Sequence, residues 1–176
     1  DWLARGGRVL LGRCHEIQRT VPLAPWAAAL DGAVMPADLD RVLGTASPAR
    51  RQVGRLLPRP DAGVIDPDAA TRGNRAGLFA AILAVLTGLA REQPLALALE
   101  DVQWADPWTL DMLAWAARGI GYARVLIALT AREEELVDTP SLETLIRDLA
   151  HERVLDRLPL GRLSRSDVDQ LVRDVV

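Results

Sequence analysis

The stretch that decides the fold is Leu95-Ala-Leu-Ala-Leu-Glu-Asp-Val-Gln-Trp-Ala-Asp-Pro-Trp-Thr-Leu110. Its first five residues are uniformly apolar, which predicts a strand buried on both faces, as in parallel sheets. Glu100 and Asp101 follow directly, so we expect their carboxylates at the carboxyl edge of the sheet, where such folds bind ligands. Two adjacent acids there indicate a Mg²⁺ site with an activated water. The alternative is that both are solvated acids at a strand end.

The second half of this stretch predicts a helix that begins at Pro107. Asp106 is a preferred N-cap residue, and proline is favoured at the first helical position. Apolar residues then recur at the spacing of one buried helix face, at Leu110, Leu113, Ala114 and Ala117. Capping explains Asp106 by itself, and a polar contribution to a metal's surroundings is the alternative. For Trp104 and Trp108, packing of the loop against the sheet is favoured over stacking on a base or a partner.

Strands and helices are expected to alternate along the rest of the chain. Apolar runs predict three further strands, at residues 8–14, 124–130 and 154–160. Apolar periodicity and capping residues predict helices at residues 25–30, 37–43, 49–57, 78–90, 107–118, 140–150 and from 164 onward. This alternation implies right-handed crossovers and a parallel sheet, and therefore an α/β fold.

Several local signals refine these boundaries. Thr139 is expected to cap the helix that starts at the next residue, and Ser164 with Asp167 forms a capping box before the last helix. Residues 61–73 are expected to form a loop. Residues 20–67 are rich in proline and glycine, which indicates a helical insertion or lid rather than a second domain.

Composition limits the classes of function. The 176 residues, 49% of them hydrophobic, suffice for one domain with a core of its own. A net charge of -3 argues against a nucleic-acid surface, so any contact with DNA is expected through a separate domain outside this chain. A single cysteine, Cys14, excludes an intrachain disulfide and a cysteine-based zinc cluster, which favours a cytoplasmic location. His15 and His151 lack metal-binding partners at ligand spacing, and no apolar stretch is long enough to span a membrane.

All 21 basic residues are arginines. A P-loop of the form G-x-x-x-x-G-K-[ST] uses a lysine to reach the β- and γ-phosphate oxygens, so the chain contains no such loop. A genome biased toward arginine codons explains the missing lysine but does not supply the loop. Residues 2–7 are expected to form the end of a helix with glycine at its C-cap, and the last helix has no stop signal. The sequence is therefore expected to be truncated at both ends.

The strand, the Glu-Asp pair, the Val-Gln-Trp-Ala-Asp-Pro segment and the helix of residues 95–118 resemble the Walker B segment of AAA+/STAND signal-transduction ATPases. The resemblance is to the Orc1-like AAA domain of large LuxR-type transcriptional regulators. It implies a P-loop NTPase-like AAA+ fold, of which residues 1–176 form a partial domain without the first strand and the P-loop. It also implies that the missing strand would lie between the strands at 124–130 and 154–160. That gap would leave backbone groups unpaired, at about 1 to 3 kcal/mol each, so the chain alone is expected to be poorly stable.

The resemblance also assigns roles to three residues. Glu100 would coordinate Mg²⁺, and Asp101 would coordinate it as well and orient or deprotonate the attacking water. Arg132, just after the strand at 124–130, would be the sensor 1 arginine that reads the γ-phosphate, a contact that suits a guanidinium. The alternative for Arg132 is a surface ion pair with Glu133, Glu134 or Glu135.

The implied function is the Walker B and sensor 1 half of an ATP-binding, Mg²⁺-dependent ATPase switch in a bacterial LuxR-type regulator or related signalling protein. ATP and ADP are the implied ligands, and self-association is expected through the intact domain. Residues 1–176 alone are expected to be inactive, because phosphoryl transfer depends on positioning and charge from both halves. The alternative is a non-catalytic nucleotide-fold scaffold for protein–protein assembly. A third possibility, an unrelated Mg²⁺-dependent hydrolase, would need a further acid or nucleophile at another strand tip, and none is found.

Overall fold

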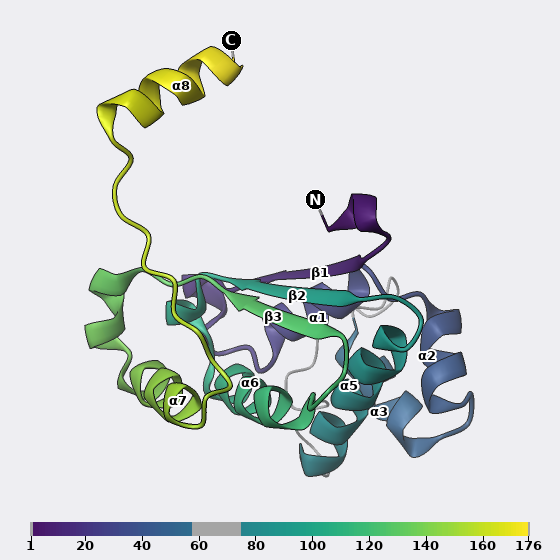
Figure 1. Ribbon diagram of the computed structural model, residues 1–176. Coiled ribbons are helices and arrows are strands. Elements are labelled where there is room, and N and C mark those ends of the chain that lie inside the picture. Colours follow the sequence, from purple (N-terminus) through teal and green to yellow (C-terminus); the bar gives the residue numbers. More distant parts are fainter. Residues whose placement is uncertain (1, 58–74, 176) are drawn as a thin grey trace.

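A parallel three-stranded sheet forms the centre of the protein in a computed structural model that describes residues 2–57 and 75–175. The strands are β1 (Arg8–Arg13), β2 (Leu95–Glu100) and β3 (Val125–Leu129), in the order β1-β2-β3. Leu97 of β2 pairs with Leu10 on one side and Ile127 on the other. Helices connect the strands, as Figure 1 shows, so the predicted α/β fold with a parallel sheet is confirmed.

The helices match the expected ones closely. They are α1 (Ala24–Asp31), α2 (Pro36–Leu43), α3 (Pro48–Leu56), α5 (Arg75–Ala90), α6 (Pro107–Gly119), α7 (Pro140–His151) and α8 (Arg165–Val175). Short 3₁₀ turns are η1 (Leu3–Arg5), η2 (Glu16–Gln18), η3 (Val102–Trp104) and η4 (Glu133–Asp138). The loop expected at residues 61–73 lies outside the described residues. The insertion expected at residues 20–67 stays a prediction; its described part forms α1, α2 and α3, of which the last two pack on α5.

The core lies on one face of the sheet. Leu10, Leu97 and Leu99 are fully buried there, together with Trp26 of α1. In Figure 1, α5 and α6 lie on this side, whereas α8 lies beyond the opposite side. Among the described residues that opposite face is open, because every second residue of β2 is only partly buried and the edge strands are more exposed. The alternation along each strand therefore separates a core face from an uncovered one.

Close packing of β1 on α1 explains a glycine near the end of this strand. A Cβ atom added to Gly12 would lie 2.2 Å from the carbonyl oxygen of Pro25, inside the first turn of α1. Only a residue without a side chain lets this helix approach the strand so closely. The parallel ladder places the end of β1 beside the end of β2.

The prediction of a fourth strand at residues 154–160 is wrong. After α7 the chain runs through residues 154–164 without helix or strand until α8 begins. Leu158 and Leu160 are exposed. A strand exists only when its backbone pairs with a neighbour, and β3 is the last strand of the described sheet. The apolar residues alone could not supply that partner.

Thr139 is the N-cap residue of α7, as expected, but its side chain does not cap the helix. Its hydroxyl donates to the carbonyl oxygens of Glu135 and Leu136, both at 3.2 Å, and accepts no backbone N–H of α7. Threonine hydroxyls compete in this way for nearby carbonyls. The Thr139 side chain therefore closes η4, whereas its backbone carbonyl accepts the N–H groups of Leu142 and Glu143 at the start of α7.

The other expected caps are confirmed. The Asp106 carboxylate accepts the backbone N–H groups of Trp108 and Thr109 at 2.9 and 3.0 Å. Ser164 and Asp167 exchange the two hydrogen bonds of a capping box before α8. Gly6, at φ 73°, ends the short turn η1. No helix among residues 2–57 and 75–175 combines the length and apolarity needed to cross a bilayer.

Candidate functional site at the carboxyl edge of the sheet

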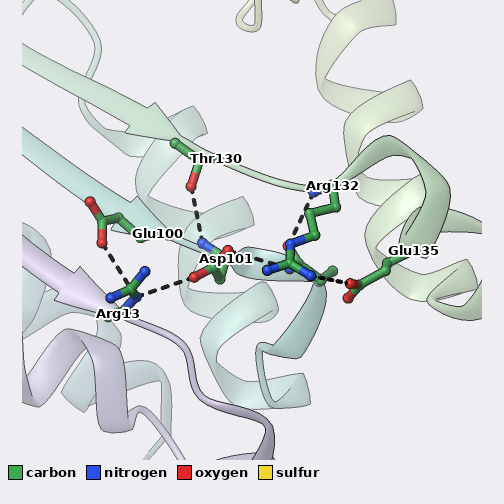
Figure 2. Close-up of polar contacts among 7 residues, drawn as sticks. Arg13, Glu100, Asp101, Thr130, Arg132 and Glu135 are labelled. Atoms are coloured by element: carbon green, nitrogen blue, oxygen red, sulfur yellow. Dashed lines mark hydrogen bonds and ion pairs between the residues drawn. The ribbon is translucent and has the colours of Figure 1, made fainter. Parts of the chain in front are cut away.

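Glu100 and Asp101 lie together at the tip of β2, as the sequence predicted. Asp101 adopts φ 57° and ψ 43°, the left-handed conformation that aspartate tolerates better than most residues. Its backbone N–H donates to the Thr130 hydroxyl at 3.1 Å, and the next N–H, of Val102, donates to the Thr130 carbonyl at 2.9 Å. The end of β3 thus fixes the turn that carries Asp101, as Figure 2 shows.

Arg13 joins this pair from β1, and the sequence analysis did not identify it. Its Nε lies 3.2 Å from Asp101 Oδ2 and 3.5 Å from Glu100 Oε2. In Figure 2 the guanidinium reaches both carboxylates. The parallel register pairs Arg13 directly with Glu100, so a charged residue at the end of the apolar run 8–14 was the available signal. The two negative charges therefore have a cation beside them.

Arg132 lies at the same edge but turns toward another partner. Its guanidinium contacts Glu135 Oε1 at 2.9 Å and lies over the Trp104 ring, 5.4 Å from the centroid. Figure 2 shows the same direction, toward Glu135 and η4. The structure thus contains the ion pair considered as an alternative, and sensing of a phosphate by Arg132 stays a prediction.

Gln103 is a second site residue that the sequence analysis did not identify. Its side chain is 1% exposed. The amide nitrogen Nε2 lies 3.5 Å from Asp101 Oδ1, and the amide oxygen accepts the backbone N–H of Arg132 at 3.4 Å. Its main-chain carbonyl accepts a hydrogen bond from Arg19 at 2.9 Å. Gln103 therefore contacts the segments that carry both Asp101 and Arg132.

Asp106 and Trp108 have structural partners. Besides capping α6, the Asp106 carboxylate accepts the N–H of Leu23 at 3.2 Å and the hydroxyl of Thr109. Trp108 packs edge to face against Phe79, with ring centroids 6.3 Å apart. These contacts support capping for Asp106 and packing for Trp108.

Cys14 and the two histidines do not form a metal site. Burial, together with the charges of Asp106 and Asp101, raises the pKa of Cys14 to about 12, so its thiol stays protonated and is a poor metal ligand. His15 and His151 are exposed. In the part of the chain that the structure describes, no three His, Cys, Asp or Glu residues are grouped to hold a metal ion by themselves.

The Glu100 and Asp101 carboxylates nevertheless fit one side of a Mg²⁺ ion. Mg²⁺ is held by oxygen atoms, commonly one or two carboxylates completed by water and substrate phosphates. The sequence contains no phosphate-binding loop for the triphosphate of a nucleotide, because it has no lysine and no P-loop motif. These residues fit the metal and not the phosphates.

Comparison with known families identifies the type of domain. The AAA ATPase domain family matches residues 2–128, more than half of the chain. The chain belongs to the AAA ATPase domain family. The match covers Arg13, Glu100 and Asp101 and ends before Arg132. No curated protein and no solved structure matches the chain. Membership makes this domain one of the nucleotide-binding ATPase type, whose members typically use Mg²⁺.

Proposed function

We propose that this chain supplies the Walker B and sensor 1 half of an ATP-hydrolysing switch domain of the STAND type. The host would be a bacterial LuxR-type transcriptional regulator or a related signalling protein, as the resemblance of residues 95–118 suggests. Contact with DNA would then come from a separate domain, and self-association from the intact ATPase domain. The nucleotide state would switch the protein between closed and assembled forms.

The position of Glu100 and Asp101 carries this proposal. Glu100 ends the central strand of the described sheet and Asp101 follows it, and the ends of β1 and β3 lie on either side of them. Parallel sheets bind their ligands at this edge. Asp101 is also held in an uncommon backbone conformation, which is frequent at functional sites.

Each residue has a distinct chemical role in the proposal. A bound Mg²⁺ would offset the phosphate charge and polarise the substrate. Glu100 would hold the metal, and Asp101 would orient a water molecule and accept its proton. Arg132 would leave Glu135 to contact a phosphate. The ion pair between Arg132 and Glu135 is solvent-exposed and worth at most about 1 kcal/mol, so this exchange is energetically accessible.

The test measures ATP binding and hydrolysis by the natural full-length protein that contains this chain. Asp101→Asn is expected to lower kcat by about 10²- to 10⁴-fold, the usual contribution of a general base, while nucleotide binding persists. EDTA is expected to abolish turnover. Glu143→Gln, an exposed acid on α7, is the matched control and should not change kcat. Turnover that survives both Asp101→Asn and EDTA would contradict the proposal.

A non-catalytic scaffold is the second candidate, and one observation favours it. The charged groups at this edge already have partners, because Arg13 contacts both acids and Arg132 contacts Glu135. A scaffold would show no Mg²⁺-dependent ATP turnover by the full-length protein, and Asp101→Asn would leave its assembly unchanged. Mg²⁺-dependent turnover that Asp101→Asn abolishes would exclude the scaffold.

A further inference from the structure

Gln103 is a buried amide between the two parts of the proposed site. Gln103 is 1% exposed, and a buried amide without hydrogen bonds is destabilising. The described residues give its side chain two polar partners, the Asp101 carboxylate and the Arg132 N–H. These partners are 31 residues apart in sequence and belong to the ends of different strands.

The chemistry of the two partners fixes the orientation of the amide. A carboxylate only accepts hydrogen bonds, and a backbone N–H only donates. The amide nitrogen must therefore face Asp101, and the amide oxygen must face Arg132. Rotation of the amide by half a turn would place oxygen against oxygen and nitrogen against N–H. Gln103 thus has one orientation that satisfies both contacts.

We propose that Gln103 is a positioning residue that couples the carboxylate of Asp101 to the segment that carries Arg132. This inference rests on the proposed roles of Asp101 and Arg132 and adds the physical link between them. Both contacts, at 3.5 and 3.4 Å, are longer than the usual 2.9 to 3.0 Å. A rigid amide can shorten one contact only by lengthening the other or by pulling its partner along. Movement of Asp101 toward a cation therefore changes the hydrogen bond to Arg132.

Two substitutions separate these contacts. Gln103→Met keeps the length of the side chain but removes both the donor and the acceptor. Gln103→Glu keeps an oxygen acceptor for the Arg132 N–H and, in its ionised form, replaces the donor toward Asp101 by a second carboxylate. The same change at the exposed residue Gln170 of α8, Gln170→Met, is the matched control.

The first measurement follows NMR resonances of the protein while Mg²⁺ alone is added. In the wild type, the Asp101 carboxyl carbon and the Arg132 amide are expected to shift with the same apparent Kd. In Gln103→Met, Mg²⁺ should still shift the Asp101 resonance, but with a Kd about ten-fold higher, as for the loss of other residues that orient metal ligands. The Arg132 amide should no longer respond. Gln170→Met should behave as the wild type.

The second measurement is hydrogen exchange of the Arg132 amide without Mg²⁺. Exchange is expected to be at least about ten-fold faster in Gln103→Met than in the wild type, because the acceptor is lost. Gln103→Glu should keep the protection, and this comparison of Gln103→Glu with the wild type remains informative if Gln103→Met does not fold. Equal exchange in wild type and Gln103→Met, or loss of protection in Gln103→Glu, would overturn the assignment of the acceptor.

The outcomes distinguish this inference from the proposed function. An unchanged Arg132 response to Mg²⁺ in Gln103→Met would overturn the coupling and leave the metal site intact. If the resonances of neither Asp101 nor Glu100 respond to Mg²⁺ in the wild type, the proposed metal site is wrong, and the proposed coupling is then wrong as well.

Discussion

At the residue scale, Asp106 shows how one buried carboxylate stabilises two helices. It is 3% exposed, accepts the first free N–H groups of α6, and also accepts the N–H of Leu23 just before α1. Leu23 itself adopts a positive φ of 59°, an unfavourable conformation for a leucine. The carboxylate therefore compensates for strain in the connection between β1 and α1.

Loss of this carboxylate should be costly. Asp106→Ala removes an N-cap, worth about 0.5 to 2 kcal/mol, and leaves buried donors unpaired, at about 1 to 3 kcal/mol. We expect a loss of about 3 kcal/mol in the free energy of unfolding, measured by urea denaturation. Asp106→Asn keeps an acceptor oxygen and should cost about 1 kcal/mol. A loss below about 1 kcal/mol for the alanine variant would show that these hydrogen bonds are replaced by water.

At the element scale, a cluster of charges attaches α2 to the start of β1. The Asp38 carboxylate contacts Arg8 of β1 at 2.8 Å and Arg41 of α2 at 2.6 Å, and accepts the Met35 N–H at 3.2 Å. Burial of the carboxyl acts to raise its pKa, but the hydrogen bonds from Arg41, Arg8 and Met35 outweigh it. The pKa of Asp38 is therefore lowered from its ordinary value of 3.8.

This lowered pKa predicts a specific dependence of stability on pH. The folded state favours the ionised carboxylate, so the stabilisation is complete above the unfolded pKa and is lost as pH falls through the lower folded value. We expect Asp38→Asn to destabilise the protein at pH 7, and the difference from the wild type to shrink from about pH 5 downward. Urea denaturation at several pH values measures it. Asp156→Asn, in the exposed segment after α7, is the control, and a difference that is constant with pH would refute the explanation.

At the scale of the whole molecule, residues 2–57 and 75–175 cover the sheet on one face only. Leu11 and Leu126 on the open face are 55% and 51% exposed, whereas Leu10 on the core face is fully buried. Parallel sheets usually have both faces covered. The helix α8 also keeps its apolar residues Val168, Leu171 and Val172 exposed. Most of the stabilising burial therefore comes from the side of α1, α5 and α6.

This asymmetry predicts opposite effects of substitutions at neighbouring positions. The double change Leu11→Thr and Leu126→Thr should alter the free energy of unfolding of this chain by no more than about 0.5 kcal/mol, as for other surface positions. Leu10→Ala should cost about 2 to 5 kcal/mol because it leaves a cavity in the core. Urea denaturation measures the free energy of unfolding of both variants. A cost above about 2 kcal/mol for the double change would show that the open face is packed in solution.

The site was predictable only in part. Glu100 and Asp101 are neighbours in sequence and follow an apolar run, so their position at the strand tip could be inferred from local pattern. Arg13 and Thr130 join them through the register of three strands, which no spacing in the sequence reveals. Gln103 is close to Asp101 in sequence, but its contact with Arg132 also depends on the fold. The ion-pair partner of Arg132 could not be predicted either, because three glutamates follow it in sequence. Only the geometry of η4 selects Glu135.

The sequence by itself determined the parallel α/β arrangement, most helix boundaries and the caps at Asp106 and Ser164. These features depend on periodicity and on hydrogen bonds between residues a few positions apart. Only the tertiary structure decided that residues 154–160 form no strand and that Thr139 closes η4. It also decided which cation lies beside the two acids. Strand pairing and long-range ion pairs depend on which backbones become neighbours, and chain topology sets that, not local composition.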